Sequence, residues 1–216
     1  MKKISKRLEK IFSYLTSCEY LADVGCDHGY IAKLALDSGI AKKVCISDIS
    51  EKSLNKAINL LSDYGDEKVF SVVSDGLELV PNTVDQVLIA GMGGEEIVKI
   101  LSSSHFLPKK LVLSPMKNGE KVRKLLIELG YQIVHDTIFS DGDKFYFLIT
   151  ADFGGKSVYT DMELEFGKES LKSKVLVLYL DQKIANLEKS FDQKSEKQKE
   201  KIQSLTKIRN EINRNL

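Results

Sequence analysis

A glycine-containing loop near the start of the chain holds the residues best placed to do chemistry. It lies between an apolar run and a segment with helical spacing, and it reads Ala22-Asp23-Val24-Gly25-Cys26-Asp27-His28-Gly29-Tyr30. In α/β sheets, a loop that ends a strand and opens a helix is where nucleotides bind. We predict that Asp23, Gly25 and Gly29 contact a cofactor. We expect Asp27 and His28 to border the reacting atoms.

The charge of Asp27 indicates which nucleotide ligand suits this loop. Asp27 stands two residues after Gly25, where a pyrophosphate-binding loop carries glycine. A carboxylate about 4 Å from a phosphate oxygen repels it by about 4 kcal/mol at an effective dielectric of 20. S-adenosylmethionine instead brings a sulfonium and an ammonium, which the same carboxylate attracts. The loop therefore favours S-adenosylmethionine over a nicotinamide dinucleotide, with Asp27 itself as a cofactor contact.

Two further strand-like runs end in acidic residues. Asp48 closes the second run, 23 residues after Gly25, where a carboxylate can accept both ribose hydroxyls, and Ile49 follows it. Asp75 and Gly76 close the third run and are suited to contact an adenine edge. Any one of these acids could instead cap a helix or form a turn. Acids at the ends of three consecutive strands together indicate one cofactor pocket.

The fourth run ends in a denser glycine cluster, Ala90-Gly91-Met92-Gly93-Gly94. A tight turn needs only one or two glycines, so three in four residues indicate close approach of a ligand or a flipped base. We predict that Ala90, Gly91, Met92 and Gly93 line the same crevice, at the point where the strand order reverses. Met92 could equally fill the core.

Five compact apolar runs alternate with segments of helical periodicity. The predicted strands cover 20–24, 44–49, 69–74, 84–90 and 110–114, and the predicted helices cover 30–38, 53–64, 95–103 and 120–129. A short helix from Leu8 precedes them, with Ser5 as its N-cap. Because parallel neighbours need a crossover connection, this alternation predicts a parallel sheet with helices on both faces.

The alternation ends with two strand-like runs, 131–139 and 145–153, joined by a short segment with turn chemistry. That connection is too short for a crossover, so the two runs must pair antiparallel. Five parallel strands followed by a hairpin is the element order of the seven-stranded, Rossmann-like sheet of class I methyltransferases. A dinucleotide-binding dehydrogenase domain would continue with another crossover instead.

After Gly155 the composition changes. Residues 156–216 carry 13 Lys and Arg against 10 Asp and Glu, a charge of +3, whereas residues 1–155 carry −2. Apolar spacing predicts two amphipathic helices, 171–191 and 202–216, with 192–201 between them as a solvated helix tip or the turn of a helical hairpin. We predict an α/β domain over 1–155, including the leading helix, and a helical tail over 156–216.

Overall composition excludes several classes of protein. The net charge of +1 gives no bulk field that would indicate a nucleic acid or membrane partner, so any polyanion must be held by local charge. No apolar stretch is long enough to span a bilayer, and the basic start runs into an amphipathic pattern rather than a signal-peptide core. Three cysteines without a CxxC pair predict free thiols and no metal site. We expect a cytoplasmic protein with no membrane contact.

Several of these segments together resemble one family. They are Ser5-Lys6-Arg7-Leu8, Asp23-Val24-Gly25, Asp27-His28-Gly29-Tyr30, Asp75-Gly76-Leu77 and above all Ile89-Ala90-Gly91-Met92-Gly93-Gly94. They resemble, in order from about residue 5 to residue 153, the TrmK family of bacterial tRNA (adenine-N1)-methyltransferases that modify position 22. The resemblance implies a class I methyltransferase domain, S-adenosylmethionine as cofactor and a C-terminal helical hairpin or coiled coil that helps to grip tRNA.

The substrate contacts that follow from this resemblance are Arg7, Tyr30, Lys117 and Arg123, on a monomer that holds tRNA. Tyr30 could stack on a base or pack against its own helix. Two departures from the family are visible. The family has Gln-Pro-Asn where this chain has Ser114-Pro115-Met116, so no asparagine contact is available there, and Gly29 replaces an alanine, which loosens the start of the helix.

Three other functions share part of this pattern. A methyltransferase for another RNA, a small molecule or a protein would share every cofactor argument, and its tail would more naturally form a lid. A non-catalytic RNA-binding module would keep the fold but not the cofactor, which the acids at 27, 48 and 75 argue against. A nicotinamide enzyme is disfavoured by Asp27 and by the terminal hairpin.

Overall fold

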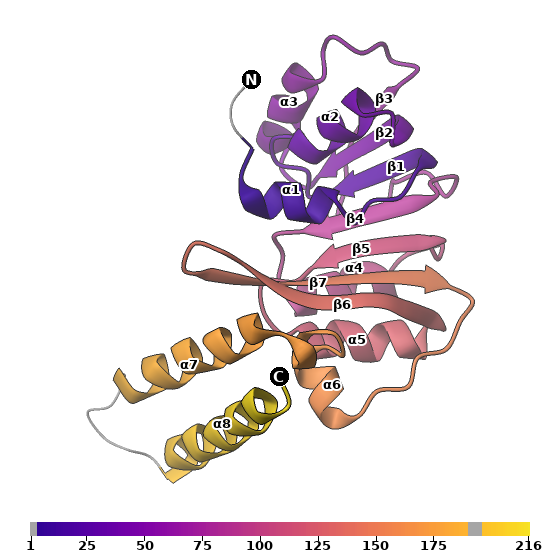
Figure 1. Ribbon diagram of the computed structural model, residues 1–216. Helices are drawn as coiled ribbons and strands as arrows, with labels where there is room; N and C mark the ends of the chain where they lie inside the picture. Colours follow the sequence, from indigo (N-terminus) through magenta and orange to yellow (C-terminus); the bar gives the residue numbers. More distant parts are fainter. Residues whose placement is uncertain (1–3, 190–195) are drawn as a thin grey trace.

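A computed structural model describes residues 4–189 and 196–216 of the chain, and its centre is one seven-stranded sheet (Figure 1). The strand order is β3-β2-β1-β4-β5-β7-β6. The first five strands run parallel, and β7 pairs antiparallel with both β5 and β6. The strand bounds are β1 Cys18–Val24, β2 Ala41–Asp48, β3 Val69–Val73, β4 Gln86–Ala90, β5 Lys110–Ser114, β6 Tyr131–Asp141 and β7 Lys144–Phe153. The predicted parallel sheet and terminal hairpin are therefore confirmed.

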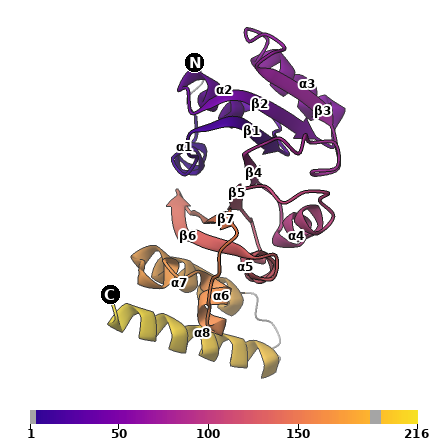
Figure 2. The same cartoon turned by 90° about the vertical axis from the view of Figure 1, so that its right-hand side faces the viewer.

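Helices cover both faces of this sheet (Figures 1 and 2). The helices α1 Lys6–Phe12, α2 Tyr30–Asp37 and α3 Glu51–Leu60 pack on one face, and α4 Gly94–Ser102 and α5 Gly119–Glu128 pack on the other. Successive strand residues point to opposite faces, so Leu21 joins the core under α1 to α3 while Ala22 joins the core under α4 and α5. Two apolar faces explain why the parallel strands have continuous apolar sequences.

The strand order reverses beside β1, whose two neighbours are β2 and β4. In open α/β sheets, ligands bind outside the carboxyl ends of the strands at such a switch point. The loops after β1 and β4, which contain Gly25 and Gly91, therefore lie side by side. This is the position that the two glycine clusters predict.

Within the described residues, four helical elements follow the hairpin. They are α6 Asp161–Phe166, a 3-10 turn at Ser170–Lys172, α7 Lys174–Lys189 and α8 Glu196–Arg214. A third apolar cluster joins them to the sheet, and it contains Leu176, Leu180 and Leu205 together with Ile138 of the hairpin, with Phe147 packed against it. Figure 1 shows α7 and α8 side by side at the end of the sheet formed by β6.

Three details of the tail differ from the sequence prediction. Helix α6 was not predicted, although Thr160 and Glu163 form a capping box at its start. The helix expected from residue 171 begins only at Lys174, because Ser170–Lys172 forms the 3-10 turn. Of the segment 192–201, residues 196–201 are the first turns of α8, and the others lie outside the described residues. In the parts of the chain that the structure describes, no helix is long and apolar enough to cross a membrane.

Candidate functional site

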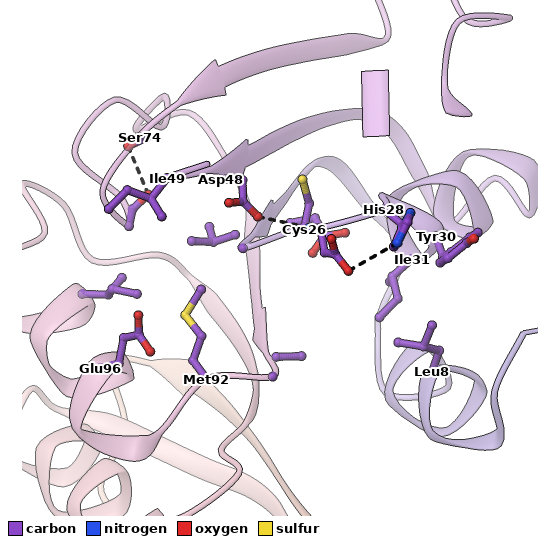
Figure 3. A pocket seen from close by; sticks show the side chains of 18 of the residues that line it. Leu8, Cys26, His28, Tyr30, Ile31, Asp48, Ile49, Ser74, Met92 and Glu96 are labelled. Carbon is purple, nitrogen blue, oxygen red and sulfur yellow. Dashed lines mark hydrogen bonds and ion pairs between the residues drawn. The ribbon is translucent and has the colours of Figure 1, made fainter. Parts of the chain in front are cut away.

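A cavity of about 540 Å³ lies at the carboxyl ends of β1 to β4, at the switch point of the sheet (Figure 3). Its volume is in the range of small-molecule sites. Most residues predicted from the sequence to bind cofactor or substrate line it: Arg7, Asp23, Gly25, Asp27, His28, Tyr30, Asp48, Ile49, Asp75, Gly76, Ala90, Gly91 and Met92. We call this cavity the switch-point pocket.

Two of the predicted glycines, Gly29 and Gly93, do not line the pocket. Gly29 precedes α2 with φ +69°, and a Cβ there would lie 2.8 Å from the Cβ of Ala57, so glycine allows α2 and α3 to approach each other. Gly93 is the N-cap of α4 and lies against the side chain of Lys117. Both glycines shape the helices that surround the pocket.

Gly25 and Met92 join the loops after β1 and β4. Gly25 has φ +70°, and a Cβ on it would lie 2.1 Å from the Cε of Met92. The thioether of Met92 therefore lies directly on the backbone of Gly25, and it also packs against the core beneath α4. The sequence left open whether Met92 faces the cofactor crevice or the core, and the structure places it at the boundary of both (Figure 3).

Asp27 adopts a left-handed backbone conformation, φ +44°, which is uncommon for residues other than glycine. Its N–H donates to Oδ2 of Asp48 at 3.2 Å, and Oδ1 of Asp48 accepts from the N–H of Ser50 at 2.8 Å. The Asp27 carboxylate pairs with Lys56 at 3.2 Å while remaining 60% exposed. Lys56 offsets part of the Asp27 charge, so the 4 kcal/mol repulsion of a phosphate derived from sequence is an upper bound.

His28 and Tyr30 form a stacked pair at the edge of the pocket (Figure 3). Their ring centroids are 5.4 Å apart with an interplanar angle of 25°. The His28 Nε2 lies 3.7 Å from Oδ2 of Asp27, and about half of the His28 side chain is exposed. A flat, partly exposed aromatic surface beside a carboxylate is suited to stack on a planar base.

Asp23 is the buried carboxyl of the site. It is the penultimate residue of β1 and lines the pocket with only 6% of its surface exposed. Burial raises the pKa of Asp23 to about 7, the hydrogen bond from the Ala32 backbone opposes this shift, and the charge of Asp48 adds to it. Any cation that enters the pocket stabilises the ionised form of Asp23.

The pocket as a whole is acidic. Five carboxylates line it, with one guanidinium: Asp23, Asp27, Asp48, Asp75, Glu96 and Arg7. Lys56 and Lys99 pair with Asp27 and Asp75 from outside the pocket, at 3.2 and 2.9 Å. Such a site suits a ligand with positive groups and disfavours a phosphate-rich one. The backbone cradle at Gly25 and Gly91, both with positive φ, gives such a ligand close access.

Arg7 connects α1 to the hairpin and to the pocket. Its backbone N–H donates to Oδ2 of Asp141, the last residue of β6, at 3.1 Å, and its guanidinium lies over the ring of Tyr146, 4.9 Å from the centroid. A Cβ on Gly91 would lie 3.4 Å from the Nη2 of Arg7, so the guanidinium also borders the second glycine loop. The Arg7 Nε is buried without a hydrogen-bond partner within the described structure. Arg7 therefore lines the pocket, and its contact with substrate stays a prediction.

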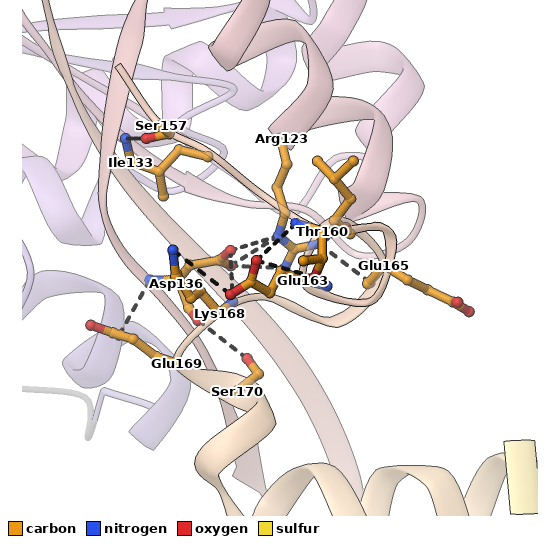
Figure 4. A network of polar contacts seen from close by, with 11 residues as sticks. Arg123, Ile133, Asp136, Ser157, Thr160, Glu163, Glu165, Lys168, Glu169 and Ser170 are labelled. Atoms are coloured by element: carbon orange, nitrogen blue, oxygen red, sulfur yellow. Dashed lines mark hydrogen bonds and ion pairs between the residues drawn. The ribbon is translucent and has the colours of Figure 1, made fainter. Parts of the chain in front are cut away.

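The position of Arg123 contradicts the prediction that it contacts the substrate. Its side chain is fully buried and forms a bidentate pair with Asp136 at 2.8 Å (Figure 4). Its Nη1 donates to the carbonyls of Leu164 and Glu165, at 3.0 and 3.4 Å. The cation therefore holds α6 against β6 and cannot reach a nucleic acid. Lys117, by contrast, is exposed beside Gly93, outside the switch-point pocket.

Several residues that line the pocket were not predicted to be site residues. They are Ser5, Leu8, Val24, Cys26, Ile31, Ser74, Glu96 and Ile100. The sequence identified Ser5 as an N-cap and as part of the segment that resembles the TrmK family, but a capping pattern does not tell which surface the cap faces. Cys26 is in the glycine loop, but burial raises the pKa of its thiol, so it is a poor nucleophile. Among the described residues, no group of three or more His, Cys, Asp or Glu side chains could hold a metal ion.

Comparison with known proteins agrees with this geometry. Residues 4–149 match the family described as Methyltransferase domain. The tRNA (adenine(22)-N(1))-methyltransferase of Bacillus subtilis is 28% identical over 171 residues, which cover 76% of this chain and 72% of that protein. A Mycoplasma pneumoniae protein is 32% identical over 133 residues, and the chain spans 62% of that protein's length.

Among solved structures, TrmK of M. capricolum in complex with S-adenosyl-homocysteine superimposes with a TM-score of 0.85. The two chains are 26% identical, and the match covers 97% of this chain and 98% of the other. The match therefore includes the C-terminal helices as well as the sheet.

Proposed function

We propose that this chain, which belongs to the methyltransferase domain family and within it to the TrmK family, transfers a methyl group from S-adenosylmethionine to N1 of adenine 22 in tRNA. The observation that carries the proposal is the acidic switch-point pocket, in which the predicted residues from four strand ends meet in a volume of about 540 Å³. The resemblance found in the sequence and the relatives of known name agree on the reaction.

The pocket fits S-adenosylmethionine by charge and by shape. Asp48 is the last residue of β2, and although both its oxygens accept backbone N–H groups, each keeps a lone pair for a ribose hydroxyl. We assign Asp75 and Gly76 to the adenine edge, and Asp23 and Asp27 to the ammonium and sulfonium, because all four residues line the pocket. When bound, the cofactor supplies an electrophilic methyl group whose C–S electron pair stays on sulfur.

Methyl transfer to adenine N1 depends on alignment of the two reactants more than on a general base. Adenine N1 is neutral and carries its own lone pair, so no proton has to leave before it attacks. Holding N1 in line with the S–CH₃ bond can supply about 7 to 11 kcal/mol of barrier lowering. The His28–Tyr30 pair offers a surface for the extruded base, and Asp27 faces the positive charge that the methylated ring gains.

The remaining parts of the proposal concern partners and organisation. We propose that the chain acts as a monomer in the cytoplasm, with tRNA as its partner. Residues 1–155 would carry the reaction, and residues 156–216 would help to hold the tRNA. The charge difference between the two parts supports this division, since the tail carries +3 and the remainder −2.

Labelled methyl donor, unmodified tRNA and nucleoside digestion test the reaction. We expect N1-methyladenosine in the digest and none when guanine replaces adenine at position 22. Asp27→Ala should abolish methylation with the fold intact, while Asp66→Ala, a matched exposed acid outside the pocket, should leave turnover unchanged. Label found only in protein or small solutes would favour one of the other methyltransferase functions, and no binding of S-adenosylmethionine would favour the non-catalytic module.

A further inference from the structure

A second cavity, of about 580 Å³, lies between the loop after β5, strand β7 and the C-terminal helices. It shares no lining residue with the switch-point pocket. Lysines and aromatic side chains from both parts of the chain line it, including Lys117, Lys124, Phe145, Tyr179, Lys183 and Lys201. We call it the lysine groove.

Aromatic rings form one side of the lysine groove. Phe145 and Phe147 are two residues apart on β7 and so lie on the same face of the strand. Both rings meet the ring of Tyr179 on α7 edge to face, with centroid distances of 5.7 and 5.6 Å. All three side chains are only partly buried although they border an apolar cluster. Partly exposed aromatic rings in a cavity are surfaces on which a base can stack.

The lysines of the groove have few carboxylate partners. Within the described residues, Lys117, Lys124 and Lys183 form no ion pair, and Lys183 lies over Tyr179, 5.4 Å from the ring centroid. Lys201 pairs with Glu165 at a distance of 3.8 Å.

Acids are also present in the groove, but they do not outnumber the lysines. The acids that line it are Glu120, Asp161 and Glu165, against four lysines. The switch-point pocket has the opposite balance, five carboxylates against one guanidinium. A polyanion that delivers a neutral base to the acidic pocket therefore needs cations elsewhere, and the lysine groove provides them.

One short segment separates the two cavities. The N–H of Met116 donates to the carbonyl of Met92 at 2.9 Å, and the N–H of Gly94 donates to the carbonyl of Lys117 at 2.8 Å. Met92 lines the switch-point pocket, while Met116 and Lys117 line the groove, and the Met116 side chain is about half exposed. The lysine groove thus begins directly beside the loop after β4, which lines the switch-point pocket.

We propose that the lysine groove binds the tRNA strand next to the target nucleotide, with phosphates on Lys124 and Lys183 and an unpaired base on Tyr179. This inference rests on the proposed function, because it assumes that the target base enters the switch-point pocket. Phosphate contacts set the register of the strand without specifying its sequence. The groove would therefore orient the target base while the pocket performs the chemistry.

Charge removal tests the proposal on the full-length protein. Lys124→Gln and Lys183→Gln remove one groove charge each, and Lys68→Gln removes an exposed, unpaired lysine before β3, at the far edge of the sheet. We expect each groove variant to weaken tRNA binding by roughly tenfold and to lower the slope of log K against log salt by about 1. Lys68→Gln should change neither quantity. Affinity for S-adenosylmethionine should be unchanged in all three variants, because none of the three lysines lines the switch-point pocket.

The outcomes separate this proposal from the proposed function. If wild-type protein methylates tRNA but the groove variants bind tRNA with unchanged affinity and salt slope, the groove proposal is wrong and the function stands. Equal losses in the groove variants and in Lys68→Gln would also overturn it, since they would report bulk charge. If wild-type protein neither binds nor methylates tRNA, the proposed function fails and the groove proposal fails with it. Groove-dependent binding of an acidic protein instead of tRNA would assign the groove to that partner and overturn the proposal.

Discussion

The buried carboxyl of Asp23 should make cofactor affinity depend on pH near neutrality. Burial raises its pKa from 3.8 to about 7, so ionising it in the cofactor-free protein costs about 4 kcal/mol more than in water. A cation beside Asp23 favours the carboxylate and lowers this pKa. Cofactor binding is therefore coupled to release of the Asp23 proton.

The size of the effect follows from this linkage. If the cofactor binds only the ionised form of Asp23, the fraction of protein in that form rises from about one tenth at pH 6 to about nine tenths at pH 8, because the pKa in the free protein is about 7. Affinity for S-adenosylmethionine should therefore be about tenfold tighter at pH 8 than at pH 6. Asp23→Asn removes the titrating group and should remove this dependence.

Calorimetric titration at pH 6, 7 and 8 measures the effect. Any protonation of the cofactor itself affects the wild-type protein and Asp23→Asn equally. It therefore cancels in the ratio of their two dissociation constants. His28→Gln is the control, because it removes an imidazole from the pocket and should keep the wild-type dependence. A wild-type to Asp23→Asn ratio that stays constant from pH 6 to 8 would refute the reasoning.

The same carboxyl affects the stability of the cofactor-free protein. Its folded-state pKa lies above the ordinary value, so the folded protein retains a proton that the unfolded chain releases between about pH 4 and 7. The contribution of Asp23 to stability is therefore present at low pH and is lost as the pH rises through about 7. Asp23→Asn should flatten this part of the stability profile in urea denaturation.

Three further predictions concern the framework of the site. Arg123→Met leaves Asp136 buried without its cation and should lower the free energy of unfolding by about 3 to 5 kcal/mol in urea denaturation; a loss below 1 kcal/mol would contradict the role assigned to the pair. Gly25→Ala forces alanine into a left-handed conformation, at about 1 to 2 kcal/mol, and displaces Met92. Thermal unfolding should show the loss, and adding Met92→Ala should restore part of it. Asp141→Ala removes the acceptor of the Arg7 backbone N–H in the first turn of α1 and should lower the free energy of unfolding by about 0.5 to 2 kcal/mol. Hydrogen exchange should then quicken in α1 and stay unchanged in α8.

The sequence alone predicts the pocket well because its residues follow strand ends. Gly25, Asp48, Asp75 and Gly91 each stand just after an apolar run, and parallel strands bring their carboxyl ends to one edge of the sheet. Local patterns of this kind need no knowledge of distant contacts. The short helix α6 could also have been found, because its capping box lies within four residues of sequence.

Contacts between distant segments explain what the sequence could not predict. Arg123 resembles an exposed cation on an amphipathic helix, and only the return of the chain through β6 brings Asp136 against it. Ser5 and Leu8 line the pocket because α1 lies against the hairpin, a contact made between residues more than 130 positions apart. The lysine groove likewise combines β7 with α7 and α8, so no single stretch of sequence contains its pattern.

The position of β7 also imposes an order on folding during synthesis. The last strand of the sheet lies inside it, between β5 and β6, so the open edge of β5 stays unpaired until Phe153 has left the ribosome. At about 5 to 20 residues per second, the interval from Ser114 to Phe153 lasts roughly 2 to 8 s. During that time the nascent chain exposes an apolar strand edge, the usual starting point of aggregation. The C-terminal helices, which pack on the same hairpin, can dock only after this edge has closed.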